Sequence, residues 1–175
     1  FIIYSFIHFL LFYYHIWIYQ VEQIIKKKIH TLFKKMKQSN KTLKIITNGQ
    51  KLYEFTSDLI KYVNSAKIKN GLLTIYVKHT SCSLLIQENA DIDVQKDLLS
   101  FFSKIVPEDA NYIHQSEGSD DMPAHIKSAL TQTSLSIPIE NFEITLGTWQ
   151  GIYLFEHRTM KHTRTIKLHL IGQNG

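Results

Sequence analysis

The stretch GLLTIYVKHTSCSLLIQE, residues 71–88, contains the clearest structural pattern in the chain. Successive side chains of a β-strand point to opposite faces, so Leu73, Ile75 and Val77 share one face. That face is apolar and leads directly to His79. The pattern therefore predicts a half-buried strand whose inner face ends at a histidine that is turned toward the protein interior.

Strand patterns also occur on both sides of this stretch. KTLKIIT is followed by the turn signal Asn48-Gly49, and Pro138 within LSIPI indicates a position near a sheet edge. The predicted strands outside residues 71–88 cover residues 41–47, 51–55, 135–139, 142–157 and 163–172.

Three segments predict helices, and they cover residues 56–66, 91–105 and 120–130. In the first, Thr56 or Ser57 is the expected N-cap, and Leu59, Ile60 and Val63 fall on one face. Regular strands with turn signals and few helices favour an α+β fold. We expect a β-sandwich of two sheets with two to three inserted helices, formed by residues 36–175.

Residues 1–35 differ from the rest of the chain. Residues 1–20 are uncharged and long enough to span a bilayer, and Lys26, Lys27 and Lys28 follow them. The segment is built mostly from residues with A/T-rich codons, and the first Met is Met36. Three interpretations stay open: a product of translation upstream of the start codon, a membrane anchor, or another helix.

Charge and cysteine content exclude some classes of protein. Residues 1–35 contain five Lys and one Glu, or +4, so only +1 of the total of +5 lies in the remaining 140 residues. This distribution argues against a nucleic-acid-binding face, which needs clustered basic side chains. The single cysteine, Cys82, excludes an internal disulfide and indicates a reducing compartment such as the cytoplasm.

Three histidines form the most interesting candidate site. His79, His114 and His125 are each flanked by small or polar residues, and neutral imidazole is a common metal ligand. Three such ligands leave an open position for water or a substrate. The alternative is that all three are surface histidines or hydrogen-bonded core histidines. His162 and His169 lie in polar surroundings and are expected to be solvated.

The residues around His125 have a structural and a functional interpretation. Either Asp120 or Asp121 is the expected N-cap of a helix with Pro123 in its first turn. The second carboxylate is then free to orient an imidazole or to bind a cation. His125 is expected in the first turn, where the helix dipole favours its neutral form.

A last candidate region is LGTWQGIYLFEHR, residues 146–158. Gly147 and Gly151 weaken a strand and are typical of places where a backbone or a ligand approaches closely. Trp149 either stacks on a flat ring or packs at an interface. The guanidinium of Arg158 suits a phosphate or carboxylate, although a surface salt bridge is the common alternative.

Four motifs together resemble the YjbQ-type family, which is described as secondary thiamine-phosphate synthase enzymes. They are KHTSCSLLIQENAD (78–91), YIHQSEGSDDMPAHIKSAL (112–130), IPIENFEITLGTWQGIYLFEHR (137–158) and the ending HLIG. The resemblance extends from about residue 41 to residue 172, and residues 1–35 have no counterpart. It implies a β-sandwich-like α+β domain that assembles as a homotrimer.

The resemblance also implies a pocket in which His79, His114 and His125 hold a divalent metal, either Zn or Mg. Matching motif positions place further residues near this pocket or the subunit interface. Those expected to act in catalysis are Glu88, Asp121 and Ser81, and those expected to bind the substrate are Asn89, Thr148, Trp149, Gln150, Glu156 and Arg158.

The implied reaction is a weak thiamine-phosphate synthesis. It joins hydroxymethylpyrimidine diphosphate to thiazole phosphate and releases pyrophosphate, a step that needs a cation to neutralise the leaving group. Two alternatives stay open. One is a metal-dependent hydrolase of a small phosphorylated or amide substrate with Glu88 as general base, and the other is a non-catalytic trimeric ligand-binding protein.

Overall fold

The alternation in residues 71–77 is confirmed by the computed structural model, which describes residues 2–174. These residues form β3 (Asn70–Val77), in which Leu73, Ile75 and Val77 are at most 1% exposed. The strand pairs antiparallel with β5 (Ser134–Glu140) on one side and β8 (Lys161–Gln173) on the other. It is therefore the central strand of a sheet.

The strands form two sheets, as the sequence predicts. The larger sheet has the order β1-β8-β3-β5-β6, and the smaller has the order β2-β7-β4. The strands not yet given are β1 (Met36–Asn48), β2 (Lys51–Glu54), β4 (Cys82–Glu88), β6 (Glu143–Ile144) and β7 (Gln150–Glu156). The core contains buried aliphatic residues of β3, β4, β5, β7 and β8 together with one side of α2 (Thr56–Ala66).

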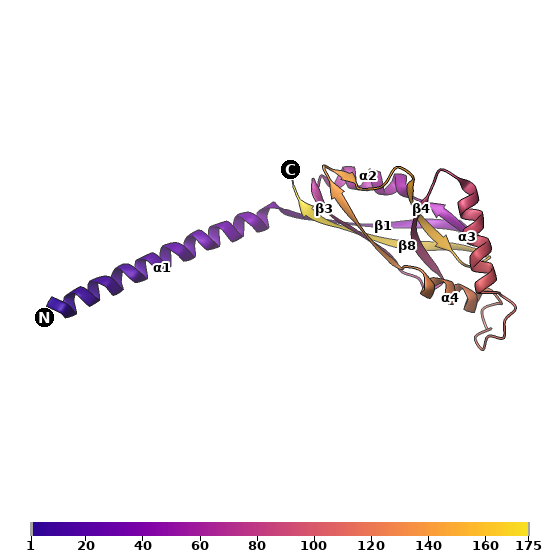
Figure 1. Cartoon of the computed structure of the whole chain (residues 1–175), viewed down its shortest axis with the longest axis horizontal. Helices are drawn as coiled ribbons and strands as arrows, with labels where there is room; N and C mark the ends of the chain where they lie inside the picture. Colours follow the sequence, from indigo (N-terminus) through magenta and orange to yellow (C-terminus); the bar gives the residue numbers. More distant parts are fainter. Residues whose placement is uncertain (1, 175) are drawn as a thin grey trace. The chain divides into compact units, whose positions relative to one another are not determined.

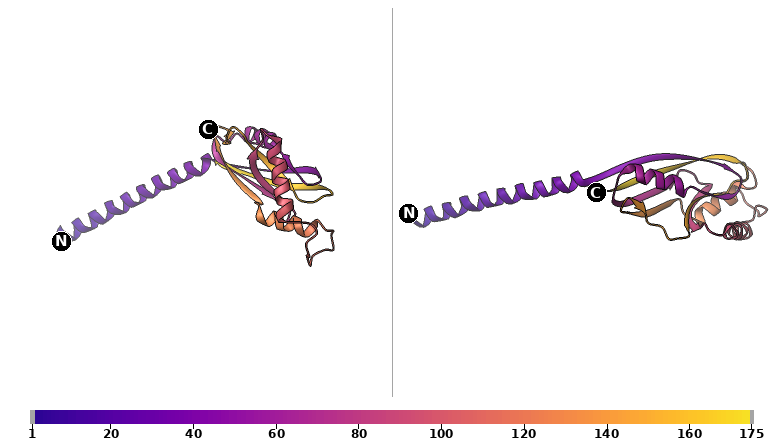
Figure 2. Two further views of the ribbon diagram at one scale, coloured as in Figure 1. Left: turned by 45° about the vertical axis from the view of Figure 1, so that its right-hand side comes forward. Right: turned by 90° about the horizontal axis from the view of Figure 1, so that it is seen from above.

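Three helices lie between strands of the two sheets. They are α2, α3 (Ile92–Ile105) and α4 (Asp121–Leu130). Figures 1 and 2 show α3 and α4 near each other at one end of the sheets, with the loop that joins them projecting outward, and α2 at a distance. Because α4 packs against β4, the start of α4 lies beside this end of the smaller sheet.

The predicted helix ends are partly right. Asp91 caps α3 by accepting a hydrogen bond from the backbone N–H of Asp93. In α2, however, neither Thr56 nor Ser57 is the cap, because the N-cap position is Phe55 and makes no side-chain capping bond. The Thr56 hydroxyl instead accepts a hydrogen bond from the backbone of β7, so it joins the helix to the sheet.

Two further expectations are wrong. Ile60 is 45% exposed, and the buried face of α2 consists of Leu59, Tyr62, Val63 and Ala66. The long strand expected over residues 142–157 is two strands, β6 and β7, separated by the turn in which the Gly147 N–H donates to the Gln150 side chain. The interruption allows β6 to pair in the larger sheet and β7 in the smaller one.

The chain divides into two compact units, Phe1–Lys37 and Gln38–Gly175. The first contains α1 (Ile2–Lys35). Across the residues that the structure describes, no helix is both long and apolar enough to cross a membrane.

A buried ion pair joins β1, β7 and β8. Glu156, at the end of β7, is fully buried and accepts hydrogen bonds from Arg164 and from the Thr47 hydroxyl. Burial raises the pKa of Glu156, but the hydrogen bonds from Arg164 and Thr47 outweigh this effect and leave the pKa below its ordinary value. The carboxylate is therefore ionised inside the protein.

We predict that Glu156→Gln destabilises the fold at pH 7 by about 3–5 kcal/mol, because Arg164 then remains buried without its counter-charge. Urea unfolding at pH 7 measures this loss, with Glu140→Gln, which changes an exposed carboxylate of β5, as the matched control. Equal unfolding free energies for Glu156→Gln and the wild type would contradict a stabilising pair.

The same pair predicts a pH dependence. A carboxyl whose pKa is lower in the folded chain stabilises the fold above its unfolded pKa, and this contribution is lost as the pH falls through the folded pKa. The difference in unfolding free energy between the wild type and Glu156→Gln should therefore shrink at acidic pH, below the ordinary range of a glutamate. A difference that does not shrink as the pH falls below that range would be inconsistent with the lowered pKa of Glu156.

Candidate metal site

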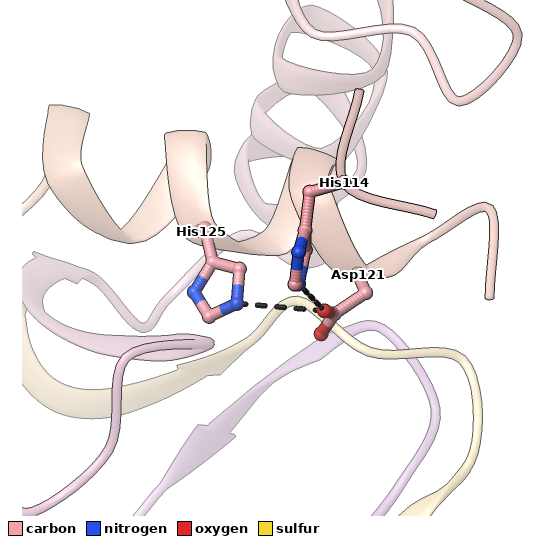
Figure 3. Close-up of side chains that lie close together, drawn as sticks. All are labelled: His114, Asp121 and His125. Carbon is pink, nitrogen blue, oxygen red and sulfur yellow. Dashed lines mark hydrogen bonds and ion pairs between the residues drawn. The ribbon is translucent and has the colours of Figure 1, made fainter. Parts of the chain in front are cut away.

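Three side chains converge at the beginning of α4. Ligand atoms of His114, Asp121 and His125 all lie within 4.8 Å of one another. Nε2 of His114 is 2.8 Å from Oδ2 of Asp121, and Nε2 of His125 is 3.5 Å from the same oxygen. Figure 3 shows both rings directed at this carboxylate. Two imidazole nitrogens and one carboxylate oxygen therefore face a common point.

The helix itself brings two of these residues together. Asp121 is the first residue of α4 and His125 is four residues later, so the two side chains lie on the same face. His125 thus lies one turn further into the helix than the sequence predicted. The i,i+4 spacing of an aspartate and a histidine was the signal in the sequence that identifies this pair. His114 comes from the loop before the helix.

A backbone hydrogen bond orients His125. Its Nδ1 lies 3.0 Å from the carbonyl oxygen of Thr80, in the segment between β3 and β4. Since a carbonyl oxygen can only accept, Nδ1 donates in this contact, and Nε2 is the ring nitrogen that faces Asp121. Ligating histidines in metalloproteins commonly donate their second N–H to a backbone carbonyl in this way.

The two aspartates have different partners. Asp121 is buried and shares its Oδ1 with the Arg158 guanidinium, while Oδ2 faces the histidines. Asp120 occupies the N-cap position but makes no side-chain capping bond. Its carboxylate instead accepts hydrogen bonds from Arg158 and from Thr159, and these bonds outweigh burial and lower its pKa. Asp120 is therefore the N-cap residue by position, as expected, but its side chain does not cap α4.

His79 does not belong to this group. Its Nε2 accepts a hydrogen bond of 2.8 Å from the backbone N–H of Thr165 in β8. Burial, together with the nearby charge of Arg164, lowers the pKa of His79 and favours its neutral form. The histidine therefore joins the end of β3 to β8, and its Nε2 is already occupied by a protein donor.

Most of the expected substrate-binding residues lie at the other end of the smaller sheet. The antiparallel pairing of β4 with β7 places Cys82 opposite Glu156 and Glu88 opposite Gln150. Seven residues at about 3.3 Å each separate these ends by about 20 Å. The histidine group lies at the Cys82 end, and the far end holds Glu88, Asn89, Thr148, Trp149 and Gln150.

The far end has packing roles that the sequence did not reveal. Gly151 in β7 lies against the side chains of Glu54, Tyr153 and Asn89, and an added Cβ would come within 2.9 Å of the first two. The close approach that this glycine permits is therefore a contact within the protein. Trp149 is 65% exposed and does not pack into the core of its own chain.

Two further expected site residues, Glu156 and Ser81, contact Arg164. Glu156 is fully buried in its pair with Arg164, so its carboxylate is not accessible to a substrate. The carbonyl of Ser81 accepts a hydrogen bond from Arg164, whereas its hydroxyl has no hydrogen-bond partner among the residues described here. His157 is buried, and its Nε2 lies 2.9 Å from the Ser83 hydroxyl.

A pocket of about 330 Å³ lies next to His114, formed by the loop between α3 and α4. Glu108 lines it, and the Gln50 amide donates to Glu108 Oε1 at 2.8 Å. Its described lining residues include no Lys or Arg, and they are Glu108, Asp109, Ala110, Asn111, Tyr112, His114, Gln115 and Ser119. The pocket is large enough for a small molecule, and its own side chains offer no cation to a phosphate.

The donor atoms fit a divalent transition-metal ion better than they fit magnesium. Zinc is bound by imidazole nitrogen and carboxylate oxygen, and a catalytic zinc has three protein ligands and one open position. Magnesium prefers oxygen ligands in octahedral geometry. His114, Asp121 and His125 supply two nitrogens and one oxygen, and His114 remains 46% exposed at the surface. The group therefore has the donors and the access that a zinc-type site requires.

Comparison with known proteins agrees with this architecture. The chain is 51% identical over 138 residues to UPF0047 protein sll1880 from Synechocystis sp. The aligned region is 78% of this chain and 94% of that protein. UPF0047 protein YjbQ from Escherichia coli O157:H7 is 40% identical over 134 residues, or 76% of this chain and 97% of that one.

Solved structures have the same fold. A YjbQ/UPF0047 family protein from Clostridium acetobutylicum has a TM-score of 0.68 at 33% identity, covering 75% of this chain and 98% of that chain. A YbjQ-like protein of unknown function from Sulfolobus solfataricus has a TM-score of 0.74 at 21% identity, covering 79% and 99%, and shows likeness of fold alone. A family model described as UPF0047 protein YjbQ-like matches residues 41–173. The chain therefore belongs to the YjbQ-like UPF0047 family.

Proposed function

We propose that this protein is a metal-dependent enzyme that acts on a small phosphorylated molecule, with one divalent transition-metal ion at His114, Asp121 and His125. The observation that supports this function is the convergence of three ligand atoms within 4.8 Å. Zinc is the proposed ion, because two of the three donors are imidazole nitrogens. The adjoining pocket beside His114 is the proposed substrate site.

The proposed reaction is the thiamine-phosphate synthesis that the family resemblance implies. A bond forms between the pyrimidine methylene carbon and the thiazole nitrogen, while the bond to the diphosphate breaks. The bound ion supplies the positive charge that the leaving diphosphate needs. Arg158 is fully engaged with Asp120, Asp121 and the Glu117 carbonyl, so its guanidinium does not supply that charge. A single source of positive charge agrees with the weak activity that the resemblance implies.

Hydrolysis is the second candidate, and the position of Glu108 favours it. This carboxylate lines the pocket beside His114 and is oriented by Gln50, so it can accept a proton from a water molecule. It takes the role that the sequence suggested for Glu88, which lies at the far end of β4. Such an enzyme needs only one organic substrate.

The proposed assembly is the homotrimer that the resemblance implies. An apolar patch on the outer face of the larger sheet supports self-association. Leu72 and Tyr76 of β3 are 42% and 48% exposed, and Ile171 of β8, which pairs with Leu72, is 38% exposed. Burying this patch against another copy is favourable, since adjacent exposed apolar residues commonly mark interaction surfaces.

We predict that the metal-free protein binds one Zn²⁺ per chain and that His114→Ala, Asp121→Asn and His125→Ala each abolish stoichiometric binding. Each change removes one of three donor atoms. Calorimetric titration and metal analysis measure the loss, with His169→Ala as the control, since this histidine lies on β8 away from the group. His79→Ala should retain the ion, and loss of the ion in this variant as well as in His114→Ala and His125→Ala would restore the three-histidine assignment.

We predict product formation when the zinc-loaded protein receives both thiamine precursors, at a rate well above that of His125→Ala. Chromatographic detection of thiamine phosphate and pyrophosphate measures it. Release of phosphate from either precursor alone, with loss of activity in Glu108→Gln, would support hydrolysis instead. Tight binding of a precursor without turnover would point to a ligand-binding protein.

We predict that Tyr76→Glu and Leu72→Glu shift the protein from trimer to monomer, because each buries a charge in the proposed interface. Light scattering after size-exclusion chromatography gives the mass directly. Ile60→Glu, which adds the same charge at an exposed apolar residue of α2 outside the patch, is the matched control. A wild-type protein that is monomeric at all concentrations would refute the trimer.

A further inference from the structure

Arg158 uses every part of its guanidinium near the candidate metal site. Nε donates to Asp120 Oδ2 at 3.1 Å, Nη2 donates to the Glu117 carbonyl at 2.7 Å, and Nη1 donates to Asp121 Oδ1. The side chain is only 11% exposed. The arginine thus connects the end of the smaller sheet to the loop and to the first residue of α4.

The two oxygens of the Asp121 carboxylate have different partners. One oxygen, Oδ1, is bound by Arg158, and the other, Oδ2, faces both histidines. Rotation of the carboxylate would break the bond to Arg158, so the guanidinium limits how Asp121 can present its oxygens. A carboxylate that is held through one oxygen offers the other as a single ligand atom.

We propose that Arg158 is a positioning residue for the metal site: it holds Asp121 so that Oδ2 alone meets the ion between His114 and His125. This inference rests on the proposed metal site and assigns the coordination mode of its carboxylate. Arg158 touches neither the ion nor the substrate in this role. Asp120 holds Arg158 in place, because its carboxylate accepts hydrogen bonds from Nε of Arg158 and from the backbone N–H of Thr159.

The shape of the guanidinium is essential to this role. Its planar fork donates in three directions at once, to Asp120, Asp121 and the Glu117 carbonyl. A lysine keeps the charge but cannot reproduce the three fixed directions. Arg158→Lys should therefore retain the electrostatic attraction of Asp121 and lose its orientation, and Arg158→Gln should lose both.

The test is titration of the metal-free full-length protein with Zn²⁺ and with Co²⁺. Partners in the outer shell of metal ligands commonly contribute 10–100-fold to affinity, so we expect Arg158→Gln to weaken Zn²⁺ binding by about that factor and Arg158→Lys by less. The visible absorption of bound Co²⁺ reports coordination geometry. It should change in both variants, because the freed carboxylate can offer two oxygens.

Arg164→Lys is the matched control. Arg164, the other arginine of the chain, is also buried and paired with a carboxylate, Glu156, but it does not contact Asp121. Because Arg164→Lys keeps a positive charge beside Glu156, it should lower the unfolding temperature of the metal-free protein and leave Zn²⁺ affinity and the Co²⁺ spectrum unchanged. Asp120→Asn, which loosens Arg158 from its far side, should show a smaller change in the same direction as Arg158→Lys.

The outcomes separate this inference from the proposed function. A wild-type protein that binds neither Zn²⁺ nor Co²⁺ would overturn both. Binding by the wild type with the same affinity and spectrum in Arg158→Gln would overturn the positioning role and leave the metal site standing. Equal losses in Arg164→Lys and Arg158→Lys would show that the effect is general destabilisation, which also overturns it.

Discussion

The buried carboxylate of Glu156 is the interaction on which the fold and the site both depend. Its oxygens accept hydrogen bonds from the Arg164 side chain and from the Thr47 hydroxyl, which joins β7 to β8 and β1. Oε1 also accepts a hydrogen bond from the backbone N–H of Arg158, and this bond holds the backbone just after the end of β7. Arg158 in turn holds Asp121, the carboxylate that faces His114 and His125. The core and the candidate metal site are thus linked through one carboxylate and one arginine.

The segment from Glu156 to Arg158 is buried although all three of its residues are polar, and two different arrangements offset the cost of burying them. Glu156 and Arg158 remain charged and are paired with opposite charges. His157 is neutral instead, because burial and the nearby charge of Lys127 lower its pKa to about 3. A neutral ring can leave Nδ1 without a partner among the described residues far more cheaply than a charged one could.

The sequence predicts the local elements well and the distances between them poorly. The alternation of Leu73, Ile75 and Val77 identified β3, because burial of one face is a local periodic pattern. The motif residues around Glu88 and Trp149 were expected near the histidine pocket or the subunit interface, and the antiparallel register of β4 and β7 places them at the opposite end of the smaller sheet from the histidines. Register results from pairing across the chain, which periodicity within one segment cannot reveal.

The three candidate ligands also differ in whether local or long-range contacts hold them. Asp121 and His125 are fixed by partners far away in the sequence, Arg158 and the Thr80 carbonyl, so their orientation is set when the core forms. His114 lies on a loop whose hydrogen bonds are mostly local, such as those from Gly118 to Gln115 and from the Gln115 side chain to the Tyr112 carbonyl. Ordering such a loop around an ion costs conformational entropy, whereas the two helical ligands have already lost theirs on folding. Affinity at this site therefore depends on the core through Asp121 and His125, and access to it depends on the loop through His114.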